Sequence, residues 1–314
     1  MQPQVFFLFG FCELARQLCW SESMSTVTHK EFSDLTTQER QAILKLLEDD
    51  DSAVQGLLVD QLVSYGPSVL DWLLPLLPGE SGVMRRRIEL VKTRLGQQTF
   101  DQEFVDYCVS PEAEMDLEDG VWRLAQTEYP LICVDGYRAL LDSFAEVLRE
   151  RLEGVDGGDG IFAVVNEYLF TDLAFSGNDE NYYDPANSYL NKVIDRRVGI
   201  PISLSVVLLL ITSRLKLPVQ GVGMPGHFLC RFQTPREEFY IDAFNGGRIL
   251  SKSECISFLN GSQFGYRDEF LAPVSPRAIL LRICQNLFHI HSENEDARSA
   301  ARFQRYVSGL SRMR

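Results

Sequence analysis

One stretch of the chain places a histidine and an aspartate downstream of an apolar helix. The stretch runs from 187 to 247, and its helix begins after the breaker Gly199-Ile200-Pro201. His227 follows a Pro-Gly turn, and Asp242 ends the next apolar run, FYID. An aspartate can hold one imidazole nitrogen, which leaves the other nitrogen to act as a base. This order is typical of hydrolase sites in which a nucleophile stands at the helix start.

Ser203 is the candidate nucleophile at that position. Pro201 suits the first turn of a helix over 202–215, because its missing N–H costs nothing there. A hydroxyl in this turn lies near the positive end of the helix dipole, and His227 would have to take its proton. The alternative is structural: Ser203 caps the helix through a backbone N–H, and His227 and Asp242 form a hydrogen-bonded pair that only stabilises the fold.

A buried helix and an antiparallel sheet must position these groups. The run VVLLLI inside 202–215 is too apolar to be exposed and is helix-length, so we expect this helix to pack against the sheet. The predicted strands are 219–224, 227–233 and 238–242. Cys230 lies three residues after His227, so its side chain points to the opposite face of the strand and does not replace the nucleophile.

These segments resemble the transglutaminase-like superfamily. Within it, NSYLNKVIDRRVGIPISLSVV, PGHFLCRF and YIDAFNGG are similar to the SirB-type regulator family, whose members join such a domain to tetratricopeptide helices. A related domain occurs in an F-box protein of animals. The resemblance covers roughly 116–314 and implies an α+β fold with a papain/transglutaminase-like core. Active relatives use a Cys-His-Asp triad on amides or thioesters, and His227 and Asp242 match its second and third members.

The first member of that triad has no match. Relatives carry Gly-x-Cys at the helix start, and placing Gly199 on that glycine puts Pro201 on the cysteine. Ser203 is turned by about 200° from Pro201 at 3.6 residues per turn. The resemblance therefore implies a non-catalytic regulator or protein-interaction module with a degenerate site. Two alternatives stay open: a hydrolase or acyltransferase on amide or ester substrates using Ser203, His227 and Asp242, and a site that binds a small ligand or peptide end without turnover.

Helical patterns flank the core on both sides. Residues 30–100 contain an acidic turn, an amphipathic helix, a Gly-Pro turn and another helix, an order that resembles a HEAT-type repeat. The transglutaminase-like core is expected over 110–262, and a helical, tetratricopeptide-like tail over 263–314. Residues 1–23 are interpreted as an extension that is disordered or derives from an upstream start codon.

Composition restricts the partners and the compartment. The chain is 45% apolar and 24% charged, as in ordinary soluble proteins, and its formal net charge of -14 argues against a nucleic-acid partner. The apolar segment VFFLFGF is too short to span a bilayer. We therefore expect a cytoplasmic protein that binds a protein partner through its helical regions, with no nucleic acid and no membrane. The oligomeric state is left open.

No metal or cofactor is indicated. The seven cysteines are scattered, form no CxxC pair and do not cluster with histidine. The glycine-rich run GVDGGDG lacks the ligand spacing of a calcium loop and is interpreted as a turn. We expect no cofactor and mostly buried, reduced thiols.

Overall fold

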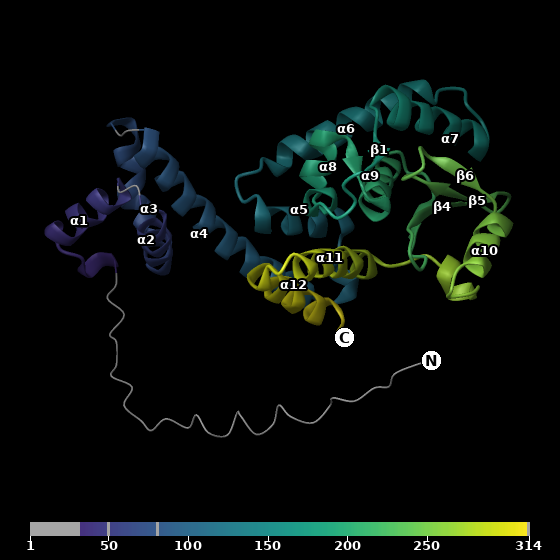
Figure 1. Ribbon diagram of the computed structural model, residues 1–314. Helices are drawn as coiled ribbons and strands as arrows, with labels where there is room; N and C mark the ends of the chain where they lie inside the picture. Colours follow the sequence, from purple (N-terminus) through teal and green to yellow (C-terminus); the bar gives the residue numbers. More distant parts are fainter. Residues whose placement is uncertain (1–31, 49–50, 80–81, 313–314) are drawn as a thin grey trace, which may run out of the picture. The chain divides into compact units, whose positions relative to one another are not determined.

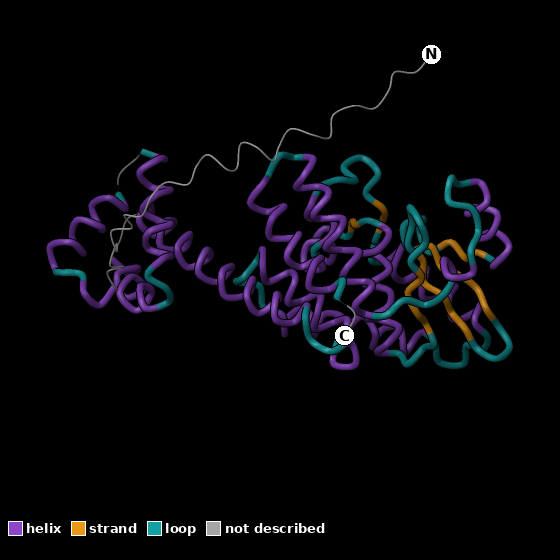
Figure 2. The backbone as a smooth tube through the Cα atoms, turned by 90° about the horizontal axis from the view of Figure 1, so that it is seen from below, coloured by secondary structure: helices purple, strands orange, loops and turns teal. Residues whose placement is uncertain are grey.

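The computed structural model describes three stretches of the chain, residues 32–48, 51–79 and 82–312. The extension expected at 1–23 lies outside them. Helices make up most of the described chain, and one small antiparallel sheet lies in its second half (Figure 1, Figure 2). Within these stretches no helix is both long and apolar enough to cross a membrane.

The chain divides into two compact units, residues 1–87 and 88–314. The first unit contains short helices, and Thr36 begins the first of them through a capping box with Glu39. Pro75 lacks the N–H that the third helix would need to continue, so this helix ends at Leu73 and a 3-10 turn begins at Leu74. The elements are η2 (Phe32–Asp34), α1 (Thr37–Leu47), α2 (Ser52–Ser64), α3 (Ser68–Leu73) and η3 (Leu74–Gly79).

The second unit holds most of α4 and every later element. Asp116, Ser251, Ser275 and Asp296 cap four of its helices with their side chains. Its longer helices are α4 (Gly82–Cys108), α5 (Leu117–Glu128), α6 (Val134–Arg151), α7 (Gly158–Asn166), α8 (Leu190–Arg196), α9 (Pro201–Arg214), α10 (Lys252–Gly261), α11 (Pro276–Glu293) and α12 (Ala297–Leu310). Its short turns are η4 (Glu112–Glu114), η5 (Glu167–Asp172), η6 (Pro185–Ser188) and η7 (Asp268–Leu271).

The main sheet is an antiparallel meander of four strands. Its order is β3 (Val219–Val222), β4 (Leu229–Gln233), β5 (Glu238–Asp242) and β6 (Arg248–Leu250), and β1 (Ser176–Gly177) pairs separately with β2 (Val198–Gly199) in parallel. The expectation that β4 begins at His227 is wrong. Gly226 has a φ of 75°, and the His227 N–H closes a turn on the carbonyl of Met224, so the ladder starts two residues later at Leu229.

The sheet lies between α9 and α10, and this layering places the candidate residues (Figure 1). Side chains alternate along β4, so Cys230 and Phe232 belong to the core cluster that contains α9. Leu229 and Tyr240 belong to a second cluster with residues of α10. The expected packing of an apolar helix on the sheet is confirmed, and α9 is buried from its first residue to Thr212.

Candidate functional site

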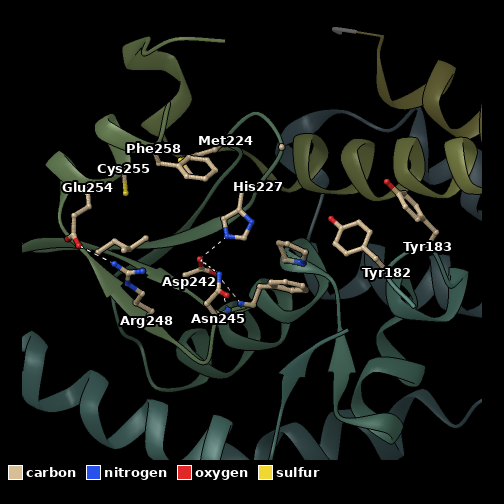
Figure 3. A pocket seen from close by; sticks show the side chains of 14 residues that line it. Tyr182, Tyr183, Met224, His227, Asp242, Asn245, Arg248, Glu254, Cys255 and Phe258 are labelled. Carbon is tan, nitrogen blue, oxygen red and sulfur yellow. Dashed lines mark hydrogen bonds and ion pairs between the residues drawn. The ribbon is translucent and has the colours of Figure 1, made fainter. Parts of the chain in front are cut away.

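A pocket of about 750 Å³ lies where the start of α9, the turn before β4, the end of β5 and α10 meet (Figure 3). Its lining includes Pro201, His227 and Asp242. The three segments that the sequence singled out, which are the helix start, the turn with His227 and the strand that ends at Asp242, therefore converge on one hollow. We call this hollow the His227 pocket.

His227 and Asp242 are in direct contact. The distance from His227 Nε2 to Asp242 Oδ2 is 2.9 Å, and the two side chains are 15% and 8% exposed. The two atoms are close, but the Nε2 hydrogen is not well aligned with the carboxylate, so the contact is not a linear hydrogen bond. The expected pairing is present, and the second ring nitrogen lies on the side of the imidazole away from Asp242 (Figure 3).

Asp242 is held in place by the turn that follows it. Its Oδ1 accepts the backbone N–H groups of Phe244 and Asn245, and its Oδ2 accepts Asn245 Nδ2 at 2.8 Å. Burial opposes ionisation of this carboxyl, but His227 and the donors of Asn245 outweigh it and lower the pKa of Asp242. Asp242 is therefore a carboxylate at neutral pH and can hold the orientation of the imidazole.

The start of α9 presents a proline to the pocket instead of a nucleophile. Ser203 Oγ accepts the N–H of Ile200 at 3.0 Å and donates to its carbonyl at 3.1 Å. Its side chain is 2% exposed and is not part of the lining that Pro201 and His227 share. This geometry is that of the capping alternative.

Neither nearby cysteine is an activated thiol. Cys230 is fully buried on the α9 side, where it donates to the carbonyl of Ser205, and burial raises its pKa to about 12. Cys255 lines the pocket, but burial and the neighbouring carboxylates of Glu254 and Asp242 raise its pKa to about 11. Both are protonated at neutral pH and are poor nucleophiles.

A polar loop before α8 brings aromatic side chains to the pocket. Asn187 is fully buried, and its amide donates to the carbonyls of Asn181 and Tyr182 at 2.7 and 3.2 Å. Asn178 in turn donates to the side chain of Asn187 at 3.0 Å. Asn187 thus holds this loop together, and this role places Tyr182 at the pocket edge.

Several pocket residues carry no signal in the sequence. Tyr182 and Tyr183 come from the polar loop, and Arg248 and Phe258 come from β6 and α10. Arg248 contacts Glu254 at 3.4 Å, and the ring of Phe258 lies 6.3 Å from that of His227. No spacing rule links these positions to the His-Asp motif, because only the folded sheet brings them together.

The helix start, the histidine turn and the aspartate strand all lie between residues 135 and 285. Residues 135–285 match the family model described as transglutaminase-like superfamily. The chain therefore contains a domain of that superfamily. No solved structure gives a significant match.

The chain is also similar to curated proteins of bacteria and animals. The chain is 40% identical over 185 residues to a UPF0162 protein of Xylella fastidiosa (strain Temecula1), over 57% of this chain and 66% of the relative. It is 26% identical over 190 residues to a UPF0162 protein of Pseudomonas aeruginosa, over 59% of this chain and 68% of the relative. It is 38% identical over 103 residues to F-box only protein 21 of Homo sapiens, over 30% of this chain and 16% of that protein. The match thus spans about two thirds of the first of these relatives.

Proposed function

We propose that the transglutaminase-like domain is a non-catalytic, regulatory binding module, which holds a peptide in the His227 pocket without cleaving it. The observation that carries this proposal is Pro201, which lines the pocket where active relatives place their nucleophile. Nucleophilic catalysis needs a hydroxyl or thiol beside the base, and a proline side chain has neither.

The rest of the pocket supports binding. Its volume of about 750 Å³ is in the range of ligand sites, and aromatic side chains and the His227–Asp242 pair line it. The similar segment in F-box only protein 21 covers only 16% of that chain, which agrees with a domain used as a module. The flanking helices, among them α1–α3 and the pair α11–α12, are the surfaces we propose for a protein partner.

The alternative is a hydrolase or acyltransferase that uses Ser203. It requires Ser203 Oγ to leave both backbone groups of Ile200 and reach His227. Ile200 is 2% exposed, so its N–H would then be buried without a hydrogen-bond acceptor. We therefore rank this alternative below the binding module.

Chemical labelling separates the two. The native chain is treated with a fluorophosphonate and with iodoacetamide, and the modified sites are mapped by mass spectrometry. We expect no phosphonate at Ser203 and alkylation at Cys133, which is exposed. Phosphonate on Ser203 that disappears in His227→Ala would establish a serine hydrolase and overturn the proposal.

A further inference from the structure

A second hollow of about 270 Å³ adjoins the His227 pocket. The two share Tyr182, Pro201, Gly226 and His227 in their linings, so they meet at the histidine. The smaller hollow also reaches Arg282 of α11, which the His-Asp chemistry does not use. We call it the Arg282 hollow.

Arg282 is a half-buried cation without an acidic partner in the part of the chain that the structure describes. Its Nη1 donates to the carbonyl of Met224 at 2.7 Å, and its guanidinium lies 5.7 Å from the ring centre of Phe228. Among residues 32–48, 51–79 and 82–312, no carboxylate lies within ion-pair distance of it. Burial lowers its pKa, which shows that the protein itself does not compensate the charge.

Four other arginines of the same unit with little exposure are treated differently. Arg214, Arg231 and Arg302 have side chains 15–17% exposed, and each contacts a carboxylate within 2.8 Å. Arg277 has no carboxylate, but it donates to three backbone carbonyls and lines neither hollow. Arg282 alone in this group keeps donors directed to a solvent-accessible hollow.

The surroundings of Arg282 favour an anion. A guanidinium offers five N–H donors in a fork that matches a carboxylate, and the carbonyl of Met224 accounts for one of them. Ile202 in the first turn of α9 lines the hollow, and the N-terminus of that 14-residue helix carries a partial positive charge. Asn286 adds an amide to the same lining.

We propose that the Arg282 hollow binds the free C-terminal carboxylate of a peptide whose apolar side chains lie in the His227 pocket. This assignment rests on the binding function proposed above. Arg282 pairs with the carboxylate, and the rings of Tyr182, Phe244 and Phe258 contact the apolar part. The free terminus thereby selects which peptides are held.

The test uses N-acetyl tripeptides that end in Phe, Leu or Gly, each as the free acid and as the C-terminal amide. Affinities for the full chain are measured by calorimetry, and the His227 ring signals are followed by NMR. We expect the acids to bind about tenfold or more tightly than their amides, because a charge-assisted pair is lost in the amide. Arg282→Gln should reduce the affinity of the acids to that of the amides and leave the amides unchanged.

Three further variants control for folding and charge. Arg282→Lys keeps the charge and should retain part of the preference for the acid. Asn286→Asp leaves Arg282 in place, adds a negative charge to the hollow and should abolish the preference. Arg305→Gln removes an exposed arginine that pairs with Asp101, and neither residue lines either hollow. This variant should leave the preference for the acid intact.

The outcomes are distinguishable. Equal binding of acids and amides in the wild type, with shifts of the His227 signals, would refute the carboxylate subsite and leave the binding pocket standing. Absence of binding and of shifts for both series would refute the pocket itself. Inorganic phosphate that displaces the acids at equal concentration would reassign the hollow to phosphate and overturn the proposal of a peptide terminus.

Discussion

Replacing Ser203 with alanine should destabilise the protein through one identifiable backbone group. Ser203 Oγ is the acceptor for the N–H of Ile200 at 3.0 Å, and both residues are 2% exposed. Alanine removes this acceptor, and no other hydrogen-bond acceptor of the Ile200 N–H is present among the described residues. The N–H of Ile200 would then be buried without a hydrogen bond.

The size of the effect follows from that change. A buried donor left without a partner costs about 1–3 kcal/mol, and a lost helix cap costs about 1 kcal/mol by itself. We therefore expect Ser203→Ala to lower the free energy of unfolding by about 1–3 kcal/mol. A serine kept only for catalysis would show no such loss.

Ser205 is a matched control two residues further along α9. It is fully buried like Ser203, but its hydroxyl has no hydrogen-bond partner among the described residues. Ser205→Ala removes a buried hydroxyl that makes no hydrogen bond, so the free energy of unfolding should stay the same or rise slightly. The pair therefore separates a hydrogen-bonding role from simple loss of an oxygen atom.

Urea denaturation followed by the fluorescence of Trp122 measures both variants. Trp122 is buried in α5 of the second unit, and replacing Trp20 and Trp72 by phenylalanine removes the other two tryptophans. Equal free energies of unfolding for Ser203→Ala and the parent would refute the capping role. A larger loss for Ser205→Ala than for Ser203→Ala would contradict the assignment of the hydrogen bonds in α9.

Two other substitutions follow from the site and its turn. Because the folded-state pKa of Asp242 is lowered, its contribution is fully present above the unfolded pKa of about 4 and is lost as pH falls below that value and through the lower folded pKa. Asp242→Asn should therefore destabilise the protein at pH 7 and flatten the acid limb of its stability, and an unchanged limb in denaturation at pH 2–7 would disprove the stabilisation by the Asp242 carboxylate. A methyl group on Gly247, whose φ is 74°, would overlap Asn166, whereas one on Gly246, with φ of 68°, meets nothing within 4 Å. Thermal unfolding should show Gly247→Ala to be about 1–3 kcal/mol costlier than Gly246→Ala, and equal losses would contradict the close approach.

Local patterns in the sequence predicted the scaffold of the site. The apolar run after Pro201 is long enough to identify a buried helix, and alternation in FLCRF and FYID identifies adjacent strands. Adjacent antiparallel strands bring their ends together, so the pairing of His227 with Asp242 follows from sequence order. The two-residue error at the start of β4 arose because the sequence pattern shows the Pro-Gly turn but not that His227 itself still belongs to it.

The remaining site residues depend on tertiary structure. Arg282 reads in the sequence as one charged position of an amphipathic helix, which predicts a solvated side chain. Only the packing of α11 beside α9 turns it toward the hollow. Tyr182 lies in a polar loop whose path is set by the side chain of Asn187, and no periodicity describes such a loop.

Restoring a thiol at the helix start tests the central claim most directly. In Pro201→Cys the new thiol would stand at the start of α9 in the pocket that His227 lines, and the helix end and the imidazole should favour its thiolate. The rate of its alkylation by iodoacetamide is measured as a function of pH by mass spectrometry, with Cys133 as the reference thiol. The pH at which this rate is half-maximal should lie at least about one unit below the pKa near 8.5 of an ordinary thiol. His227→Ala in the same variant should return it to that ordinary value. An ordinary pH dependence that is the same with and without His227 would show that Pro201 does not occupy the nucleophile position of a degenerate site.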